Sequence, residues 1–288
     1  MPAIHTNRGD INLPAEVSNE IMQKVQLESA IMRKATRIEL PGRGAAINVI
    51  TGDPSAAWVG ETEKKPVSDP NIGTKIMQAY KLAVIVPFSN EFRRDVVSLY
   101  DALLSRLPRA LGRKFDETVI VGTAPGSNFD VLSGCTQQDI SSDAYGGLVA
   151  ADGDIATHGG IMNGIILSPQ GKSVFLAAVD GDQRPLFNNV TSNGIPQMLG
   201  SEVLLSQGAY KAGTSPNPNL VGVVGDFTQA LWGSVEGVQI SISDQATLDD
   251  GNGGTINLFQ QNMFAVRAEI ELGFRADTDC FNVLTTPA

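Results

Sequence analysis

The sequence predicts an α+β protein, and three observations lead to this fold class. Apolar side chains recur every three or four residues over residues 89–119, which is the spacing of one long amphipathic helix. Residues 264–272 instead alternate apolar with polar side chains, as a strand with one buried face does. Residues 45–80 form a polar, proline-containing excursion ahead of the long helix, and they hold too few apolar side chains for a core of their own.

Length and composition indicate a folded protein. The 288 residues are 42% hydrophobic and 18% charged, which is typical of a chain with a sizeable core. No run of about 18 apolar residues occurs, so we expect no membrane span. The polar residues 1–10 predict no secretory signal. Cys135 and Cys280 fit reduced cytoplasmic thiols, while a disulfide between them stays open.

The net charge of −10 is unevenly spread along the chain. Residues 1–119 hold 16 Lys and Arg against 14 Asp and Glu, whereas residues 120–288 hold 5 against 17. Because the acidic second part repels phosphate, we do not expect a dedicated nucleic-acid-binding protein. The asymmetry indicates that the two ends of the molecule face different partners.

The N-terminal region predicts an arm followed by a helix. Residues 1–13 read as a flexible arm. Residues 14–37 place apolar side chains near one helical face, and Pro14 is tolerated in the first turn. Pro41 and Gly42 end this helix.

The excursion that follows predicts two long strands with a polar tip. Short extended runs over 46–50 and 75–80 flank the charged, proline-containing stretch 60–70. An isolated hairpin is only marginally stable in water, so this segment requires a partner surface. Trp58 lies in the excursion, and an exposed aromatic side chain favours an interface, although it could also pack back onto its own domain.

The central region predicts a buried strand, the long helix and then a loop-rich segment. Residues 82–86 read as the strand, and Ser89 is placed to cap the helix. Pro108 lies inside the helix pattern, so we expect either a kink there or two helices that meet. Residues 122–160 are rich in glycine and short polar side chains and predict loops.

The remaining chain predicts several strands with one clear turn. The turn signal is the Asp- and Gly-rich stretch 249–254. Apolar or alternating runs fall at 161–168, 172–179, 199–205, 220–224 and 235–243.

No motif in the sequence indicates catalysis. His5 and His158 are the only histidines, and without a Cys or His cluster a structural zinc site is not expected. The stretch 171–173 imitates the end of a phosphate-binding loop, but Ile166 stands where that motif requires glycine. Asp152 and Asp154 hint at a calcium loop but lack the further spaced ligands, so an ordinary surface turn is the simpler interpretation. We therefore expect no enzyme, no cofactor and no metal.

One face of the long helix carries Arg106, Arg109 and Arg113. These three side chains could form an ordinary solvated face. They could also meet carboxylates of a neighbouring subunit, or line a surface near packaged DNA.

Several short motifs occur in an order that resembles one family over nearly the whole chain. The segments that carry the resemblance are 56–61 with 65–66, then 81–87, 89–95, 116–122, 125–126, 181 with 184–187, 200, 225–227, and the closing strand with Arg267 and the tail 279–284. They are similar to those of the major capsid proteins of tailed bacteriophages, whose fold is called Hong Kong 97-like. Each motif is loose alone, but their order makes the match fairly specific.

The resemblance implies a fold with five parts and a structural role. The implied parts are an N-terminal arm and helix over 1–40, an extended two-stranded loop over 41–81, a peripheral domain with the spine helix over 82–145, an axial domain over 146–232, and a return to the peripheral domain over 233–288 that the tail completes. The chain would self-assemble as hexamers and pentamers into an icosahedral shell around double-stranded DNA, which it contacts only non-specifically.

The resemblance also implies partners and contact residues. A scaffolding protein and a portal are expected, and a decoration protein stays open; assembly would take place in the bacterial host cytoplasm and end in the virion. Scaffolding could come from a separate protein, or the helix over 14–37 could suffice. The candidate subunit contacts are Trp58, Glu61, Lys64, Lys65, Arg106, Arg109 and Arg113. Some relatives crosslink subunits through a loop lysine, but no acceptor asparagine or catalytic acid can be matched here, so no crosslink is expected.

Two other classes of protein compete with this interpretation. An encapsulin-like nanocompartment shell shares the fold but encloses a cargo enzyme, and the contents of the particle would separate the two. A small-molecule enzyme is disfavoured because no acid, base, nucleophile or cofactor constellation is present.

Overall fold

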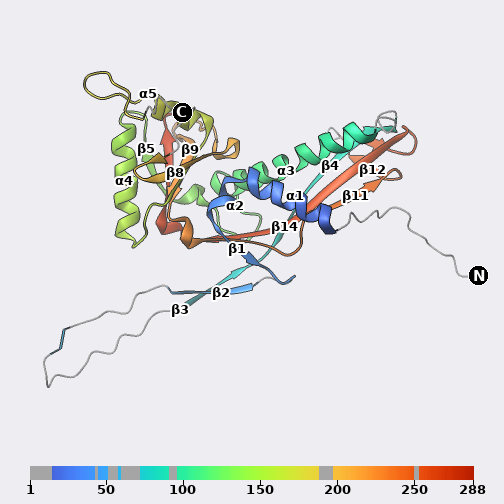
Figure 1. Ribbon diagram of the computed structural model, residues 1–288, viewed down its shortest axis with the longest axis horizontal. Helices are drawn as coiled ribbons and strands as arrows, with labels where there is room; N and C mark the ends of the chain where they lie inside the picture. The colour runs from blue at the N-terminus through green and yellow to red at the C-terminus, as the bar shows by residue number, and fades with distance from the viewer. Residues whose placement is uncertain are drawn as a thin grey trace, which may run out of the picture.

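The computed structural model describes residues 15–42, 45–50, 58–59, 72–90, 96–187, 197–249 and 253–288. These residues form the α+β architecture that the sequence predicts. A five-stranded sheet with a long helix makes up one part, and a six-stranded sheet with two shorter helices makes up the other (Figure 1). A separate two-stranded ribbon leaves the body beneath them.

The five-stranded sheet is organised around one long strand. Its members are β1 (Thr36–Glu39), β10 (Ala230–Ser234), β14 (Met263–Ala276), β11 (Gln239–Ser243) and β4 (Tyr80–Ser89). β14 pairs antiparallel with β10, β11 and β4, and β1 runs parallel to β10. The predicted alternation is confirmed, because Val266, Ile270 and Leu272 are buried while Arg267 is exposed. Ala265 departs from it, since it is buried as well.

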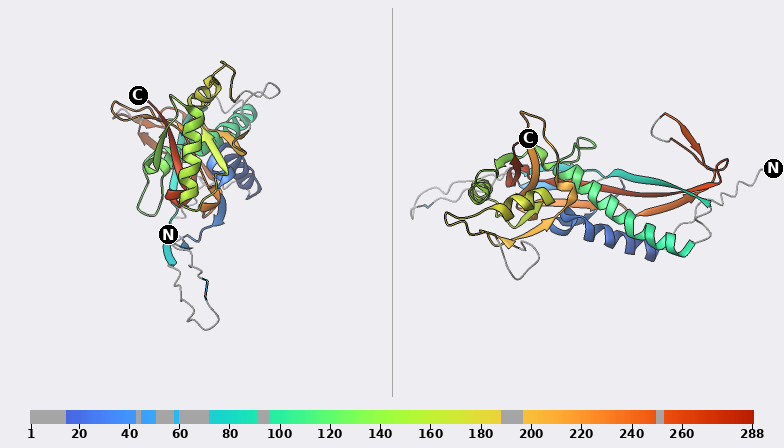
Figure 2. Two further views of the ribbon diagram at one scale, coloured as in Figure 1. Left: turned by 90° about the vertical axis from the view of Figure 1, so that its left-hand side faces the viewer. Right: turned by 90° about the horizontal axis from the view of Figure 1, so that it is seen from above.

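Three helices cover the buried face of this sheet. They are α1 (Ala15–Glu28), α2 (Ala30–Lys34) and α3 (Val96–Ile120). α1 and α3 lie along one side of the strands (Figure 2). Ser29 separates α1 from α2 and caps the start of α2. Its hydroxyl accepts a hydrogen bond from the Met32 N–H at 3.1 Å. α3 is continuous through Pro108, so a long helix is confirmed and two separate helices do not form. Ser89 was expected to cap this helix, but it is the last residue of β4 instead.

The six-stranded sheet has the order β5, β15, β9, β6, β8, β7. Its strands are β5 (Thr136–Asp139), β15 (Phe281–Thr286), β9 (Asn219–Gly225), β6 (Gly164–Leu167), β8 (Ser201–Leu205) and β7 (Gln197–Met198). The helices α4 (Ala144–Thr157) and α5 (Pro169–Ala177) pack against it and share a second hydrophobic core with it.

Helix α4 contradicts the loops expected over residues 122–160. Leu148, Ala151 and Ile155 are buried at helical spacing, and the Asp143 carboxylate accepts a hydrogen bond from the Gly146 N–H at 2.8 Å. One of the glycines that suggested a loop, Gly147, has a packing role. A Cβ on Gly147 would lie 2.8 Å from the Asp139 carbonyl oxygen, so only glycine lets the helix approach β5 this closely.

The apolar run over 172–179 lies mostly in the helix α5. Pro169 starts this helix, and the Ser168 hydroxyl accepts a hydrogen bond from the Gly171 N–H at 3.0 Å. The runs near 161–168, 199–205, 220–224 and 235–243 contain β6, β8, β9 and β11.

The C-terminal strand belongs to a different sheet from the one expected. β15 lies between β5 and β9 in the six-stranded sheet, whereas the tail was expected to complete the part that contains β14. Phe281, Val283 and Leu284 are fully buried, so this strand requires neighbours on both edges and cover on both faces. β5 pairs with one edge of β15 and so also belongs to the six-stranded sheet. Its residues 136–139 were expected in the same part of the fold as the long helix.

Smaller elements complete the description. The hairpin of β12 (Thr247–Asp249) and β13 (Thr255–Asn257) flanks the predicted turn, whose residues 250–252 lie outside the described residues. Short 3-10 turns occur at Leu132–Gly134, Gln207–Ala209, Phe227–Gln229 and Thr278–Cys280. No helix among the described residues is long and apolar enough to cross a membrane.

Candidate subunit-contact surfaces

The two-stranded ribbon is the first candidate contact surface. β2 (Ala45–Ile50) and β3 (Ile72–Met77) pair antiparallel from Ala45 opposite Met77 to Ile50 opposite Ile72, and they belong to neither larger sheet. The ribbon projects away from the body (Figure 1). A pair of strands without a covered face is marginal alone. Its stability must therefore come from its base or from another surface.

The predicted contact residues of this region are only partly described. Trp58 has a relative exposure of 104%, so its ring contacts nothing in the described part of its own chain. Packing of Trp58 back onto its own domain is therefore not observed. Glu61, Lys64 and Lys65 lie outside the described residues.

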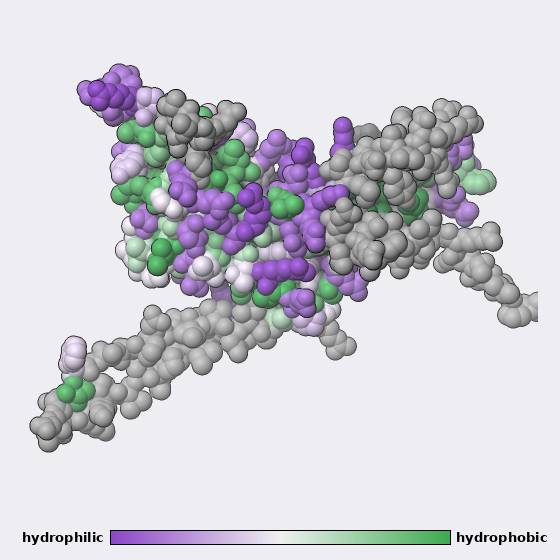
Figure 3. All heavy atoms as spheres, in the orientation of Figure 1, coloured by the Kyte–Doolittle hydropathy of each residue, from purple (hydrophilic) through white to green (hydrophobic). Residues whose placement is uncertain are grey.

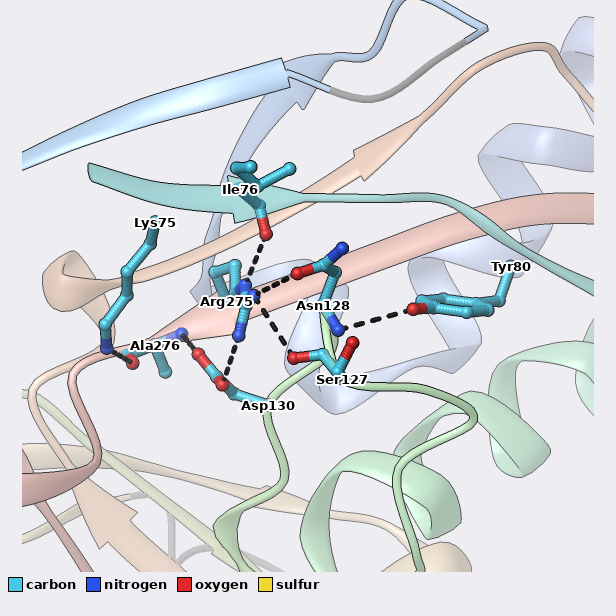
Figure 4. A network of polar contacts seen from close by, with 8 residues as sticks. All are labelled: Lys75, Ile76, Tyr80, Ser127, Asn128, Asp130, Arg275 and Ala276. Carbon is cyan, nitrogen blue, oxygen red and sulfur yellow. Dashed lines mark hydrogen bonds and ion pairs between the residues drawn. The ribbon is translucent and has the colours of Figure 1, made fainter.

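The base of the ribbon is held by Arg275, at the end of β14 (Figure 4). Its Nε donates to the Ile76 carbonyl oxygen at 2.8 Å, which holds the C-terminal end of β3. Its Nη1 forms an ion pair with the Asp130 carboxylate at 2.6 Å, and Nη2 donates to Asn128 Oδ1 at 3.2 Å. The side chains of Arg275 and Asp130 are only 12% and 20% exposed. A planar guanidinium suits this role because its donors can reach β3 and residues 127–130 at once.

Two further contacts, from β3 and β4, stabilise this junction between the ribbon and the body. Lys75 Nζ donates to the Ala276 carbonyl oxygen at 3.0 Å, and the Asn128 N–H donates to the Tyr80 hydroxyl at 3.3 Å (Figure 4). The Tyr80 ring contacts Phe129 edge-on, at a centroid distance of 6.1 Å. Gly126 permits this closeness, because a Cβ there would lie 2.4 Å from the Tyr80 hydroxyl oxygen. The junction therefore sets the direction in which the ribbon leaves the body.

The arginine row on α3 is the second candidate contact surface. Arg106, Arg109 and Arg113 are all exposed, as the helical spacing predicts. Arg109 forms an ion pair with Glu28 of α1 at 3.3 Å, and Arg113 Nη1 donates to Gln207 Oε1 at 3.0 Å. Two of the three therefore have partners within the same chain.

A buried carboxylate holds this helix layer to the six-stranded part. Asp116 accepts hydrogen bonds from the Ser29 hydroxyl at 2.5 Å and the Ser206 hydroxyl at 2.6 Å. It also accepts from the N–H groups of Ala30 at 3.0 Å and Ile31 at 3.3 Å, at the start of α2. Burial raises the pKa of Asp116, and these four donors act in the opposite direction. α2, α3 and the segment after β8 thus meet at one side chain.

The residues considered for chemistry do not converge. Asp152 and Asp154 lie in α4, so neither a calcium loop nor a surface turn forms there, and the stretch 171–173 lies in α5. No group of three His, Cys, Asp or Glu side chains suited to a metal occurs among the described residues. Burial, with the nearby Asp279 and Asp130, raises the pKa of Cys135 to about 12, so its thiol stays protonated and unreactive. Both cysteines are free.

Asp116 and Arg275 are absent from the residues that sequence reasoning selected. A signal for Asp116 was available, because it falls on the buried side of the α3 pattern, next to Phe115 and Val119. An acidic side chain there requires donors. Arg275 gave no comparable signal, since its partners lie about 150 and 200 residues earlier in the chain.

Comparison with known proteins places this architecture in one family. Residues 9–278 match the phage capsid family. The probable major capsid protein gp17 of Mycobacterium phage L5 is 28% identical over 299 residues, covering 95% of this chain and 89% of that protein. The major capsid protein of Staphylococcus phage 80alpha is 25% identical over 284 residues, covering 94% of this chain and 83% of that protein.

Solved structures share the fold. A chain of Gordonia phage Cozz superposes with a TM-score of 0.71 at 21% identity, covering 90% of this chain and 87% of that chain. A capsid chain of an empty GTA particle has a TM-score of 0.64 at 14% identity, covering 100% of this chain and 95% of that chain. These similarities confirm the Hong Kong 97-like fold. Since the family match spans nearly the whole sequence, the chain belongs to the phage capsid family.

Proposed function

We propose that the chain is the major capsid protein of a tailed bacteriophage, a structural subunit that assembles into the icosahedral head around double-stranded DNA. The match to the phage capsid family over residues 9–278 carries this proposal. The projecting ribbon supports it, because a surface that lacks its own core gains burial only from a neighbouring subunit. The role requires no catalysis, cofactor or metal.

The two parts of the fold suggest how the subunit is used. The five-stranded part with α3 would serve as the peripheral domain, and the six-stranded part with α4 and α5 as the axial domain of hexamers and pentamers. Trp58, Glu61, Lys64 and Lys65 would contact the adjacent subunit through the ribbon. A scaffolding protein and a portal would complete assembly in the host cytoplasm, before the subunit becomes part of the virion.

Electron microscopy of the purified recombinant protein tests the proposal. We expect capsomers or closed shells, because the exposed ribbon and Trp58 favour association. A monodisperse monomer of about the chain mass of 30.5 kDa under every salt and protein concentration would contradict it.

Deletion of residues 60–70 tests the role of the ribbon. This stretch lies outside the described residues, and its charged, proline-containing sequence predicts little contribution to a hydrophobic core. We therefore expect a variant with an unchanged circular-dichroism spectrum that forms few shells in light scattering. Loss of the folded spectrum would show that the segment belongs to the core of the subunit instead.

The encapsulin-like alternative predicts a shell of the same fold with different contents. The curated relatives are named major capsid proteins, which favours the phage role. Particles that contain DNA would support a phage head, whereas particles that contain one enzyme would support a nanocompartment.

A further inference from the structure

A pocket of about 700 Å³ lies between α1 and β1, at the margin of the five-stranded sheet. Its walls are residues of α1, residues of β1 and those that follow it, and residues 234–237, where β10 ends. Arg37 and Glu39 of β1 line it, and both are exposed. Hydrophilic side chains gather over the middle of the molecule, where α1 and β1 lie (Figure 3). The pocket is therefore a polar feature of the surface and not part of either hydrophobic core.

Beside this pocket, β1 leaves one edge of the sheet open. Among the described strands it pairs with β10 alone. The Leu40 N–H donates to the Ser234 carbonyl oxygen at 3.1 Å, and the backbone groups of Ile38 face β10 in the same way. Those of Arg37 and Glu39 alternate with them, so they face outward. A strand edge of this kind is a template on which a further strand can form.

The side chains at this edge favour an incoming positive charge. Arg37 is occupied by Trp232, since its Cζ lies 5.6 Å from the centre of that buried ring. Glu39 has no hydrogen bond or ion pair to any residue that the structure describes. Glu236, on the opposite wall, accepts a hydrogen bond from the Gln239 amide, which leaves its charge uncompensated. Two exposed carboxylates therefore face the pocket while its arginine is held elsewhere.

Residues 1–14, which lie outside the described residues, contain a segment that fits this edge. Their longest stretch without proline or glycine is 3–8. Ile4 and Thr6 favour a strand, and Arg8 falls on the same strand face as both. The stretch carries no carboxylate, so its charge is opposite to that of the two glutamates in the pocket.

We propose that residues 4–8 add a strand to the open edge of β1 in the same, unassembled subunit, with Arg8 beside Glu39. The length of the chain permits this return. The pocket begins about two turns into α1, which is about 11 Å from Ala15, where the helix starts. Residues 9–14 span about 20 Å when extended, so they can connect the two. The added strand would cover an edge that otherwise invites pairing with other chains.

Hydrogen exchange of the unassembled subunit, resolved to single residues by fragmentation mass spectrometry, tests the proposal. The Arg37 and Glu39 amides should exchange about 2- to 10-fold faster in Thr6→Pro than in the natural chain, the range that one net hydrogen bond provides. Proline has this effect because it lacks the N–H that a strand requires. The Ile38 and Leu40 amides face β10 in both proteins and are the internal reference.

Two further variants test the position of the segment and its charge. Asn12→Pro is the matched control, because it places proline outside residues 4–8, and the edge amides should exchange as in the natural chain. Arg8→Glu should speed exchange at Arg37, since two carboxylates would then meet at the edge. The double variant Arg8→Glu, Glu39→Arg should restore slow exchange there. Unchanged exchange of the β14 amides in every variant checks that the fold is intact.

The remaining outcomes separate this arrangement from its alternatives. Equal exchange of the two edge amides in the natural chain and in Thr6→Pro would overturn the proposal. Protection that rises with protein concentration and disappears on dilution would also overturn it, because the added strand would then come from a second copy. Failure of the natural chain to form shells would count against the proposed function alone, since the docked strand is measured in single subunits.

Discussion

At the scale of single residues, the structure depends on two charged side chains with opposite roles. Asp116 is fully buried and accepts four hydrogen bonds from two segments, residues 29–31 and Ser206. Arg275 is largely buried and donates to two segments at the ribbon base, β3 and residues 127–130. Burying an ionisable group is costly unless it has hydrogen-bond partners; each oxygen of Asp116 accepts from two donors, and Arg275 donates four hydrogen bonds. Each is therefore sensitive to changes that keep size but alter hydrogen bonding.

We expect Asp116→Asn to destabilise the subunit. Ala30 donates to one carboxylate oxygen and Ile31 to the other, so the amide group of asparagine must face one backbone N–H in either orientation. The donor left without an acceptor should cost about 1–3 kcal/mol. Urea unfolding in a mildly alkaline buffer, under non-assembling conditions, measures the loss.

Glu117→Gln is the matched control for Asp116→Asn. Glu117 is the next residue on the same helix, and its carboxylate is half-exposed beside Lys114. Its replacement should change the free energy of unfolding by no more than about 0.5 kcal/mol. If the two variants were equally stable, the buried hydrogen bonds of Asp116 would contribute nothing net.

At the scale of elements, the sequence predicted those whose pattern is local. The long helix, the closing strand and the ribbon were predictable because each shows its period or its polarity within one segment. Helix α4 was not, because its Gly147 allows close packing against β5, a contact that the sequence alone does not reveal. The sheet to which β15 belongs was not predictable either, since its neighbours β5 and β9 lie about 145 and 60 residues earlier. The exposure of Trp58 could be predicted from its place in the polar excursion. The roles of Asp116 and Arg275 could not be predicted in this way, because they depend on distant partners.

The two faces of β14 provide a prediction at this scale. Leu272→Asp should give insoluble protein, because a carboxylate among the buried residues of the core costs several kcal/mol. Arg267→Glu should leave the melting temperature of the unassembled subunit nearly unchanged, since its side chain is half-exposed. Solubility and melting curves separate the two. Equal loss of soluble protein would mean that this strand is covered on both faces.

At the scale of the whole molecule, the junction around Arg275 connects the ribbon to both sheets. β14 lies in the five-stranded sheet, and residues 127–130 lead from α3 toward β5 of the six-stranded sheet. The direction of the ribbon relative to the body is therefore coupled to the arrangement of both parts. The contact proposed between the ribbon and an adjacent subunit would depend on this direction.

We expect Arg275→Lys to impair assembly more than stability. Lysine keeps the charge beside Asp130 but cannot reach Ile76 and Asn128 together. The yield of closed shells in electron microscopy should fall, while unfolding should cost about 1–2 kcal/mol. Arg184→Lys, at a loop position that is 77% exposed, is the control and should leave shell yield unchanged. Normal shells from Arg275→Lys would show that the junction does not direct the ribbon.

The contrast between the two tryptophans makes the chain its own optical reporter. Trp232 is 1% exposed in the core of the five-stranded sheet, whereas Trp58 is fully exposed in the free subunit. The emission of Trp232 should stay constant as subunits associate, and that of Trp58 should move to shorter wavelength as a neighbour covers its ring. The difference spectrum between the natural chain and Trp58→Phe would then follow, in real time and without a label, the moment at which each ribbon is engaged.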